Sequence, residues 1–354
     1  LMPVPIDIDD LDAGVLPAQQ VRDLKAKFGP TLHEAGVMEM DGLLSHAQQN
    51  YVRKIHIPKE LIDNYDSEKL PPYLEAKRLK TKQFFLFIMT DHQKKEFKRY
   101  NKTLQVDGTH KTNKKNLIVL NGMVQGPRGE GIPIFHSIVE HEDAEAMKLS
   151  FETLREIDPE SFNKIQSLIG DMSRVHIRGW KDATNNRNVR FIACNWHFSK
   201  AMDDQHLDAP VRRFIEDMRL APDEETFHSL LKVFMLEYDG KPVANYFYKN
   251  YGPSGKIAAC QLWAQCFNKN VQLSHNMHIE SYHATLKGKR QKIIDGNTRL
   301  DSLVQRLINL DDNVAKTQFC VHHNKAQVEK TKAQIRQAEH HPPDEECGMY
   351  EIKE

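Results

Sequence analysis

The sequence predicts an α/β fold in which helices flank a mixed five-stranded sheet and an all-helical insertion interrupts it. Three observations support this prediction. Apolar strand patterns recur between residues 103 and 194, helical patterns separate the later ones, and a long helical stretch follows. Three strands come first, joined by short turns, and then helix and strand alternate. This order of elements is typical of a ribonuclease-H-like sheet.

The first three predicted strands form an antiparallel meander. Residues 103–106 alternate polar and apolar side chains, and the continuous apolar run over 116–124 fits a buried central strand. A glycine-rich turn leads to a third strand over 132–139. Pro133 near its start suits an edge strand, because proline cannot donate a ladder hydrogen bond. A helix is then expected from about Asp143, with acids in its first turn.

Two further strands and a long helical segment follow. The fourth strand ends at Asp171 and the fifth spans 189–194, with a short helix between them. We interpret residues 198–275 as a helical module inserted into the core. Its clearest helical patterns cover 211–218, 224–237 and 255–268.

Five regions are therefore expected along the chain. They are a mostly helical N-terminal region over 1–100, the first part of the core over 101–197, the helical insertion over 198–275, a core helix over 276–295, and a C-terminal helix with a polar tail over 296–354. Helices within the two terminal regions are expected over 17–28, 43–53, 58–64 and 300–332. Residues 84–89 form either a buried strand or a core helix turn.

The composition predicts a globular protein. At 354 residues, with 40% hydrophobic and 28% charged residues, the chain is long enough to bury a sizeable core. It has no apolar run near the roughly 18 residues that span a bilayer, and no signal-peptide pattern. The five cysteines are scattered without a Cys-x-x-Cys pair, which argues against a disulfide framework and a zinc ribbon. We therefore expect an intracellular protein.

Three acids occupy positions from which they can meet at one place. Asp107 and Asp171 are each expected to end an apolar strand, and strand ends are where sheets present functional side chains. Glu280 lies on a predicted helix, with His283 and Lys287 on the same flank of its apolar stripe. Carboxylate oxygens without thiolates suit Mg²⁺ or Mn²⁺, and two such ions can catalyse phosphodiester chemistry. The sequence therefore predicts a two-metal site on these three acids.

Positive charge gathers around Asp107, although the net charge of the chain is zero. Residues 94–116 contain eight Lys or Arg and two acids. Such runs are common on solvated surfaces, but the position of this one favours nucleic-acid binding. The predicted DNA-binding residues are Lys111, Lys114, Lys115 and, in a second basic segment, Lys287, Lys289, Arg290 and Lys292.

Four short motifs surround the three acids. They are Asp107-Gly-Thr-His110, Ile169-Gly-Asp-Met-Ser173, Cys194-Asn-Trp-His197, and the run from Asn276 to Lys287. Together they resemble the catalytic domain of Mutator-like (MULE) transposases, over roughly residues 85–295. The resemblance implies a ribonuclease-H-like core with a catalytic Asp-Asp-Glu (DDE) triad and an all-helical insertion before the Glu. It also implies DNA cleavage followed by strand transfer.

The resemblance also assigns roles and partners. Asp107, Asp171 and Glu280 are implied to be the catalytic residues and the ligands of two Mg²⁺ or Mn²⁺ ions. The supporting motif residues are His110, Cys194, His197 and His283. The implied partners are DNA, as element ends and target, and further copies of the chain in a homo-oligomer on DNA. The implied location is the nucleus, with no membrane association.

Zinc is not expected. The C-terminal cysteines and histidines are irregularly spaced, unlike zinc ligands: Cys320, His322, His323, His340, His341 and Cys347. For Cys194 and His197, a zinc half-site is the alternative to a structural cysteine with a histidine that bonds near the active site. For Trp263, stacking on DNA is the alternative to a place in the core of the insertion.

Two other functions are consistent with the same residues. A domesticated descendant of a transposase would bind DNA or regulatory partners without cutting, and an ordinary ribonuclease-H-like nuclease would hydrolyse DNA without joining it. The presence of all three acids favours catalysis. The large insertion, which can shape DNA ends for transfer, favours a transposase over a nuclease.

Overall fold

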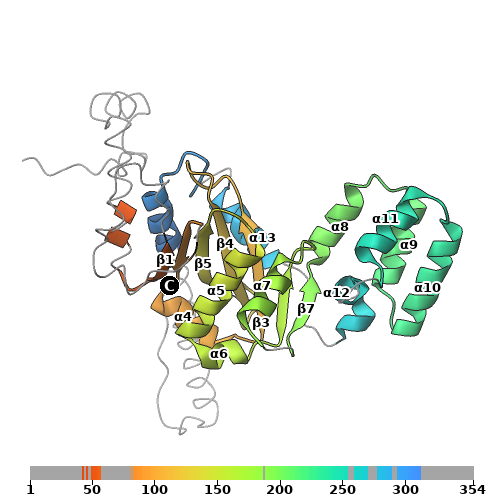
Figure 1. The fold of residues 1–354 in the computed structure, drawn as a ribbon, viewed down its shortest axis with the longest axis horizontal. Helices are drawn as coiled ribbons and strands as arrows, with labels where there is room; N and C mark the ends of the chain where they lie inside the picture. The colour runs from red at the N-terminus through yellow and green to blue at the C-terminus, as the bar shows by residue number, and fades with distance from the viewer. Residues whose placement is uncertain are drawn as a thin grey trace, which may run out of the picture.

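A seven-stranded mixed sheet forms the centre of the protein (Figure 1). The computed structural model describes residues 42–43, 45–46, 49–56, 81, 83–185, 188–253, 259–269, 277–288 and 293–311. The strands are β1 (Val52–His56), β2 (Phe85–Ile88), β3 (Thr103–Thr109), β4 (Ile118–Gln125), β5 (Gly131–Val139), β6 (Ser167–Gly170) and β7 (Arg190–Ala193). They lie in the order β1-β2-β5-β4-β3-β6-β7.

The topology of the sheet is ribonuclease-H-like, as predicted. β3, β4 and β5 form the antiparallel meander, and β6 and β7 join in parallel at the β3 edge. Because β3 and β6 are parallel neighbours, the acids that follow their apolar residues lie toward the same edge of the sheet.

The sheet has two strands more than the five predicted. β2 and β1 extend it beyond β5 in antiparallel pairing. All four residues of β2 are apolar and fully buried. Because no polar residue interrupts this run, the sequence has no periodicity that could distinguish a strand from a helix turn. Only pairing with the distant β5 makes this segment a strand.

Pro133 lies in an interior strand, not in the predicted edge strand. β5 pairs with β4 on one side and with β2 on the other, but β2 reaches only the stretch from His136 to Val139. Pro133 lies outside that stretch, beside Met123 at an irregularity in the register. Its missing N–H therefore costs no hydrogen bond to β2, which explains why the proline is tolerated inside the sheet.

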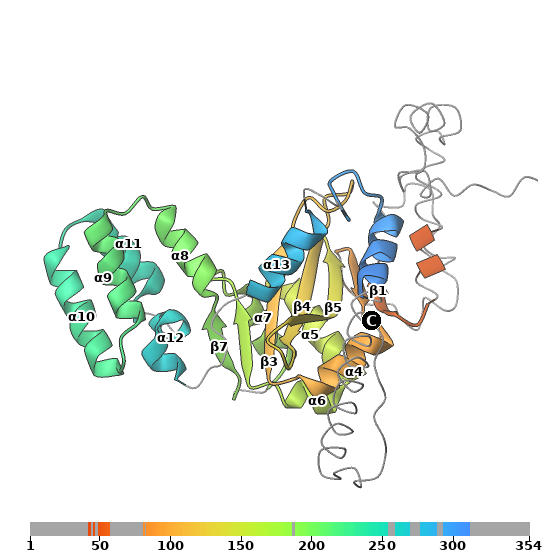
Figure 2. The ribbon, with the colours of Figure 1, turned by 180° about the vertical axis from the view of Figure 1, so that it is seen from behind.

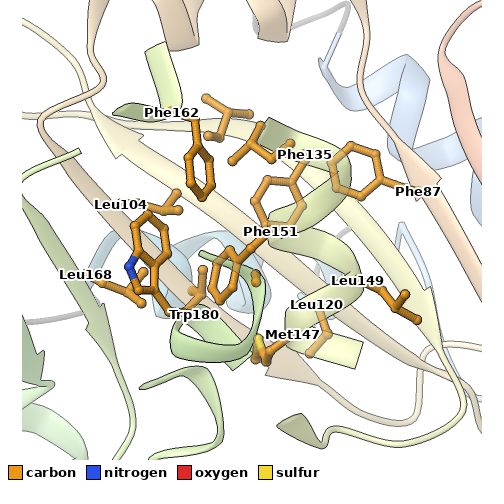
Figure 3. Close-up of a cluster of buried hydrophobic side chains, with 14 of the residues drawn as sticks. Phe87, Leu104, Leu120, Phe135, Met147, Leu149, Phe151, Phe162, Leu168 and Trp180 are labelled. Atoms are coloured by element: carbon orange, nitrogen blue, oxygen red, sulfur yellow. The ribbon is translucent and has the colours of Figure 1, made fainter. Parts of the chain in front are cut away.

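A layer of helices covers one face of the sheet (Figure 1). Asp143 begins the first of them, as predicted, because its side chain accepts a hydrogen bond from the Ala146 N–H at 2.8 Å. Beneath the layer, Trp180 is fully buried with its ring against those of Phe151 and Phe162 (Figure 3). The helices of this layer are α5 (Ala144–Ile157), α6 (Pro159–Asn163) and α7 (Val175–Ala183).

The opposite face is covered by α13 (Met277–Leu286) and by a helix over 300–311 (Figure 2). Ile279, Tyr282 and Leu286, three of the four residues of the predicted apolar stripe, lie on α13 and are buried in one cluster with residues of the sheet and of the second helix. This packing leaves Glu280 on the flank of α13. The fourth residue of the stripe, Ile293, lies beyond the end of α13 at Leu286, so the helix is shorter than the predicted 276–295. The predicted continuation of the second helix to residue 332 lies outside the described residues.

The segment after β7 is helical, and its helices gather beyond the β7 edge of the sheet (Figures 1 and 2). Trp263 is 3% exposed within their apolar cluster and stacks on Phe198, which confirms its place in the core. The helix predicted over 255–268 is divided, because Ala264 is extended. The elements are α8 (Asn195–Asp203), α9 (Ala209–Arg219), α10 (Glu224–Glu237), α11 (Pro242–Tyr251), α12 (Cys260–Trp263) and a 3₁₀ helix, η4 (Gln265–Asn268).

The described part of the N-terminal 100 residues is not mostly helical. The helix predicted over 43–53 is found only in its first part, since residues 42–43 and 45–46 are helical. β1 begins at Val52, because pairing with β2 outweighs local helical spacing there. The helix α4 (Asp91–Arg99) begins at a capping box made by Thr90 and Gln93. The helices predicted over 17–28 and 58–64 lie outside the described residues. Within the described ranges, no helix combines the length and apolar character needed to cross a bilayer.

Candidate active site

Asp107 is buried in β3, opposite Asn121 of β4, and is only 8% exposed. Burial, together with the nearby carboxylates of Glu142 and Glu280, raises the pKa of Asp107 to about 8. A hydrogen bond from the Gly108 backbone opposes this rise. A strongly perturbed acid among other acids is typical of a functional site.

Glu280 and His197 approach Asp107 from two helices that are far apart in the sequence. α13 holds Glu280 half-buried over the sheet, and α8, which begins directly after β7, carries His197 in its first turn. His197 Nε2 lies 3.4 Å from Glu280 Oε1. One ligand atom from each of Asp107, His197 and Glu280 lies within 4.8 Å of the others. These three residues form the close group of the site.

Asp171 lies beside this close group without belonging to it. Its carboxylate interacts electrostatically with Asp107, Glu142 and His197. Its Oδ1 accepts hydrogen bonds from the Ser173 N–H at 3.0 Å and from the Ser173 hydroxyl at 2.5 Å. These two bonds fix the Asp171 carboxylate in a local turn. The structure thus brings together two of the three predicted acids tightly and the third more loosely.

Glu142 is a fourth acid at the site, and no motif in the sequence indicates it. It precedes α5, and its carboxylate lies against Gly108, where an added Cβ would come within 2.4 Å of Oε2. Burial and the charge of Asp171 raise the pKa of Glu142 to about 7. The one sequence feature that could have indicated Glu142 is its position just before a helix. An acid at such a position is usually explained by its favourable interaction with the helix dipole.

The supporting motif residues occupy different depths. His110 is largely exposed and its Nε2 lies 3.4 Å from Glu142 Oε2. Cys194 is fully buried at the start of α8, and the close group that holds His197 does not include it. His283 is buried, with Nδ1 4.0 Å from Asp107 Oδ2. Burial, assisted by positive neighbours such as Lys287, lowers the pKa of His283 to about 3.

The predicted basic residues divide into three groups. Lys111, Lys114 and Lys115 are exposed on the loop that follows β3. Lys287 follows α13, and burial lowers its pKa, while the charges of Glu280 and Asp107 oppose that shift. The remaining three, Lys289, Arg290 and Lys292, lie outside the described residues.

The donor atoms of the close group fit a hard divalent cation. Two carboxylates and one imidazole converge, and burial lowers the pKa of His197, which leaves its ring nitrogens able to bind a metal at neutral pH. Burial, and after it the neighbouring carboxylates, raise the pKa of Asp107, and a bound cation would favour the ionised carboxylate against both effects. Oxygen-rich donors favour Mg²⁺ or Mn²⁺.

Part of the chain matches a known protein family. Residues 77–181 match the family described as zinc finger SWIM domain-containing protein 1/3, RNaseH-like domain. The matched range contains Asp107, Glu142 and Asp171 and ends before His197 and Glu280. No curated protein matches the chain. The fold and the family match together define a ribonuclease-H-like domain.

Proposed function

We propose that the protein is a DNA transposase of the Mutator-like superfamily, with Asp107, Asp171 and Glu280 as its DDE triad. The observation that carries this proposal is the close group, in which Glu280 reaches Asp107 at a ribonuclease-H-like sheet. Helices α8 to α12 lie between Asp171 and Glu280 in the sequence, which is where the resemblance to this superfamily expects an insertion.

Each residue of the site has a defined part in the proposed reaction. Asp107, Glu280 and His197 would hold a divalent ion, and Asp171 would add a carboxylate from the end of the adjacent strand. Divalent ions bound there would activate an attacking oxygen and stabilise the leaving one. Glu142 has a pKa of about 7, which suits it to accept a proton from an attacking hydroxyl near neutral pH.

The proposed substrate is duplex DNA, first at the element ends and then at the target. Lys111, Lys114 and Lys115 follow the strand that carries Asp107, so they can neutralise phosphates near the acids. The proposal includes a homo-oligomer assembled on DNA and a nuclear location, since strand transfer joins element ends to chromosomal DNA.

A second candidate is a transposase-derived DNA-binding or regulatory protein without catalysis. The family match favours it, because the matching description names a zinc finger protein and no catalytic activity. In that case the acids would be retained while the reaction is lost.

The deciding experiment is a strand-transfer assay with full-length protein, DNA carrying matched element ends, and Mg²⁺ or Mn²⁺. A transposase produces joined products that disappear with EDTA and in the variants Asp107→Asn, Asp171→Asn and Glu280→Gln. Cleavage without joining would indicate a nuclease. DNA binding without cleavage in either metal would indicate the second candidate.

A further inference from the structure

A row of buried polar side chains leads away from Asp107 across the sheet. The register places Asp107 opposite Asn121 and Asn121 opposite His136, on three neighbouring strands. Asn121 and His136 are fully buried, and Asp311 of the helix over 300–311 is 2% exposed. Buried polar groups are costly unless they are hydrogen-bonded, so the orientation of each group is constrained by its neighbours.

Two backbone contacts fix the orientation of the side-chain amides. The Thr90 N–H donates to Gln93 Oε1 at 2.8 Å, which identifies the oxygen of this side-chain amide. The Gln93 NH₂ group therefore donates to Asp311 Oδ2 at 2.7 Å. The Asn121 NH₂ group donates to the Val119 carbonyl at 3.3 Å. The other Asn121 atom, Oδ1, therefore accepts from the His136 Nδ1–H at 2.7 Å.

These orientations decide the tautomer of His283. The Asn121 NH₂ group lies 2.8 Å from His283 Nε2, and an amide nitrogen can only donate. His283 Nε2 must therefore accept, which leaves the single ring proton on Nδ1. That nitrogen lies 4.0 Å from Asp107 Oδ2. Behind Asn121, His136 Nε2 lies 2.9 Å from Asp311 Oδ2, and a carboxylate oxygen can only accept. His136 therefore donates from both ring nitrogens, from Nδ1 to Asn121 and from Nε2 to Asp311.

We propose that His283 is a positioning residue that directs its Nδ1–H toward the Asp107 carboxylate, with a tautomer set by Asn121, His136 and Asp311. The separation of 4.0 Å exceeds a hydrogen bond, so the N–H dipole acts on the carboxylate electrostatically in a buried environment. The metal-binding consequence rests on the proposed function, because it takes Asp107 as a ligand. Groups that orient metal ligands in this way commonly change affinity by about 10-fold or more.

The tautomer is tested directly by NMR of the full chain labelled with ¹⁵N-histidine. The His283 signals, identified by their loss in His283→Gln, are expected to show a protonated Nδ1 and an unprotonated Nε2 at neutral pH without added metal. A protonated Nε2 with an unprotonated Nδ1, or an average of the two tautomers, would overturn the proposal. This result does not depend on any activity of the protein.

Mn²⁺ binding by calorimetry separates positioning from packing. His283→Leu fills the space without an N–H and is expected to weaken binding about 10-fold. His283→Gln keeps an acceptor for Asn121 and a donor for Asp107, so it is expected to retain most of the affinity. His228→Leu, at an exposed position on the distant α10, is the control (Figure 1).

The outcomes distinguish the two proposals. Mn²⁺ binding that is unchanged in His283→Leu would overturn the positioning role and leave the proposed function intact. Wild-type protein that binds no Mn²⁺ would overturn the proposed function and, with it, the metal-binding consequence of the His283 role.

Discussion

His197 Nε2 lies 3.4 Å from Glu280 Oε1, although helices α9 to α12 lie between these two residues in the sequence. The chain therefore leaves the site at α8 and returns to it at α13. Through this contact, the position of the helical segment and the geometry of the acids depend on each other.

The first prediction concerns this contact. His197→Ala removes one donor of the close group and is expected to lower Mn²⁺ affinity about 10-fold, as measured by calorimetry. Cys194→Ala is the matched control, because the buried Cys194 is not among the ligand atoms of that group. Equal losses in both variants would instead support a Cys-x-x-His metal site.

The second prediction concerns stability and pH. The pKa of Asp107 is about 8 in the folded protein, against 3.8 for an unperturbed Asp, so the folded state binds an extra proton between about pH 4 and 8. The free energy of unfolding should therefore fall as pH rises through this window when metal is absent. An asparagine at this position does not titrate, so Asp107→Asn should not lose free energy of unfolding in this way. At pH 8 its free energy of unfolding should exceed that of wild type by more than about 1 kcal/mol.

Urea denaturation in EDTA at pH 5 and pH 8 measures this difference. The advantage of Asp107→Asn should shrink at the lower pH, where wild-type Asp107 is protonated in the folded state. A variant that is less stable than wild type at pH 8 would contradict the assignment of Asp107 to a crowded acidic site.

The third prediction concerns Glu142. Mn²⁺ binding requires Asp107 to lose its proton, so wild-type affinity should rise up to about pH 8. Glu142→Gln removes a carboxylate that raises the pKa of Asp107, so the rise in affinity should move to lower pH. Glu145→Gln, at an exposed position in the first turn of α5, is the control. Identical pH profiles for Glu142→Gln and wild type would show that Glu142 does not act on Asp107.

The fourth prediction concerns DNA binding. Reversing the charge of both Lys114 and Lys115 should weaken duplex binding and make its dependence on log salt concentration shallower by roughly 2, about one for each lost phosphate contact. The matched control reverses Lys232 and Lys249, which are exposed on α10 and α11. Binding isotherms between low and moderate salt test this prediction. Equal effects of the two double variants would reject the basic loop as the DNA contact.

Local patterns predicted the strands that carry the first two acids and the helix that carries the third. Asp171 directly follows β6, as predicted, whereas β3 continues past Asp107 to Thr109. The burial of Ile279, Tyr282 and Leu286 leaves Glu280 on the flank of α13. These features depend on neighbours in the sequence, so periodicity reveals them.

Features that depend on distant residues were missed. β1 and β2 become strands only by pairing with a sheet whose other strands follow later in the chain. Glu142 is important because the chain before α5 places its carboxylate against Gly108 of β3, which no spacing around Glu142 indicates. Asn121 gave a weak local signal, a polar residue inside a continuous apolar run, but its partner His283 lies far away in the sequence.

The most direct test of the central claim is anomalous X-ray diffraction from crystals of the full chain soaked in Mn²⁺. If the DDE site binds metal, we expect an anomalous Mn²⁺ peak within coordination distance of the Asp107 and Glu280 carboxylates. This peak should be absent in Asp107→Asn. Full Mn²⁺ occupancy elsewhere on the protein, with no peak between these two carboxylates, would contradict the account.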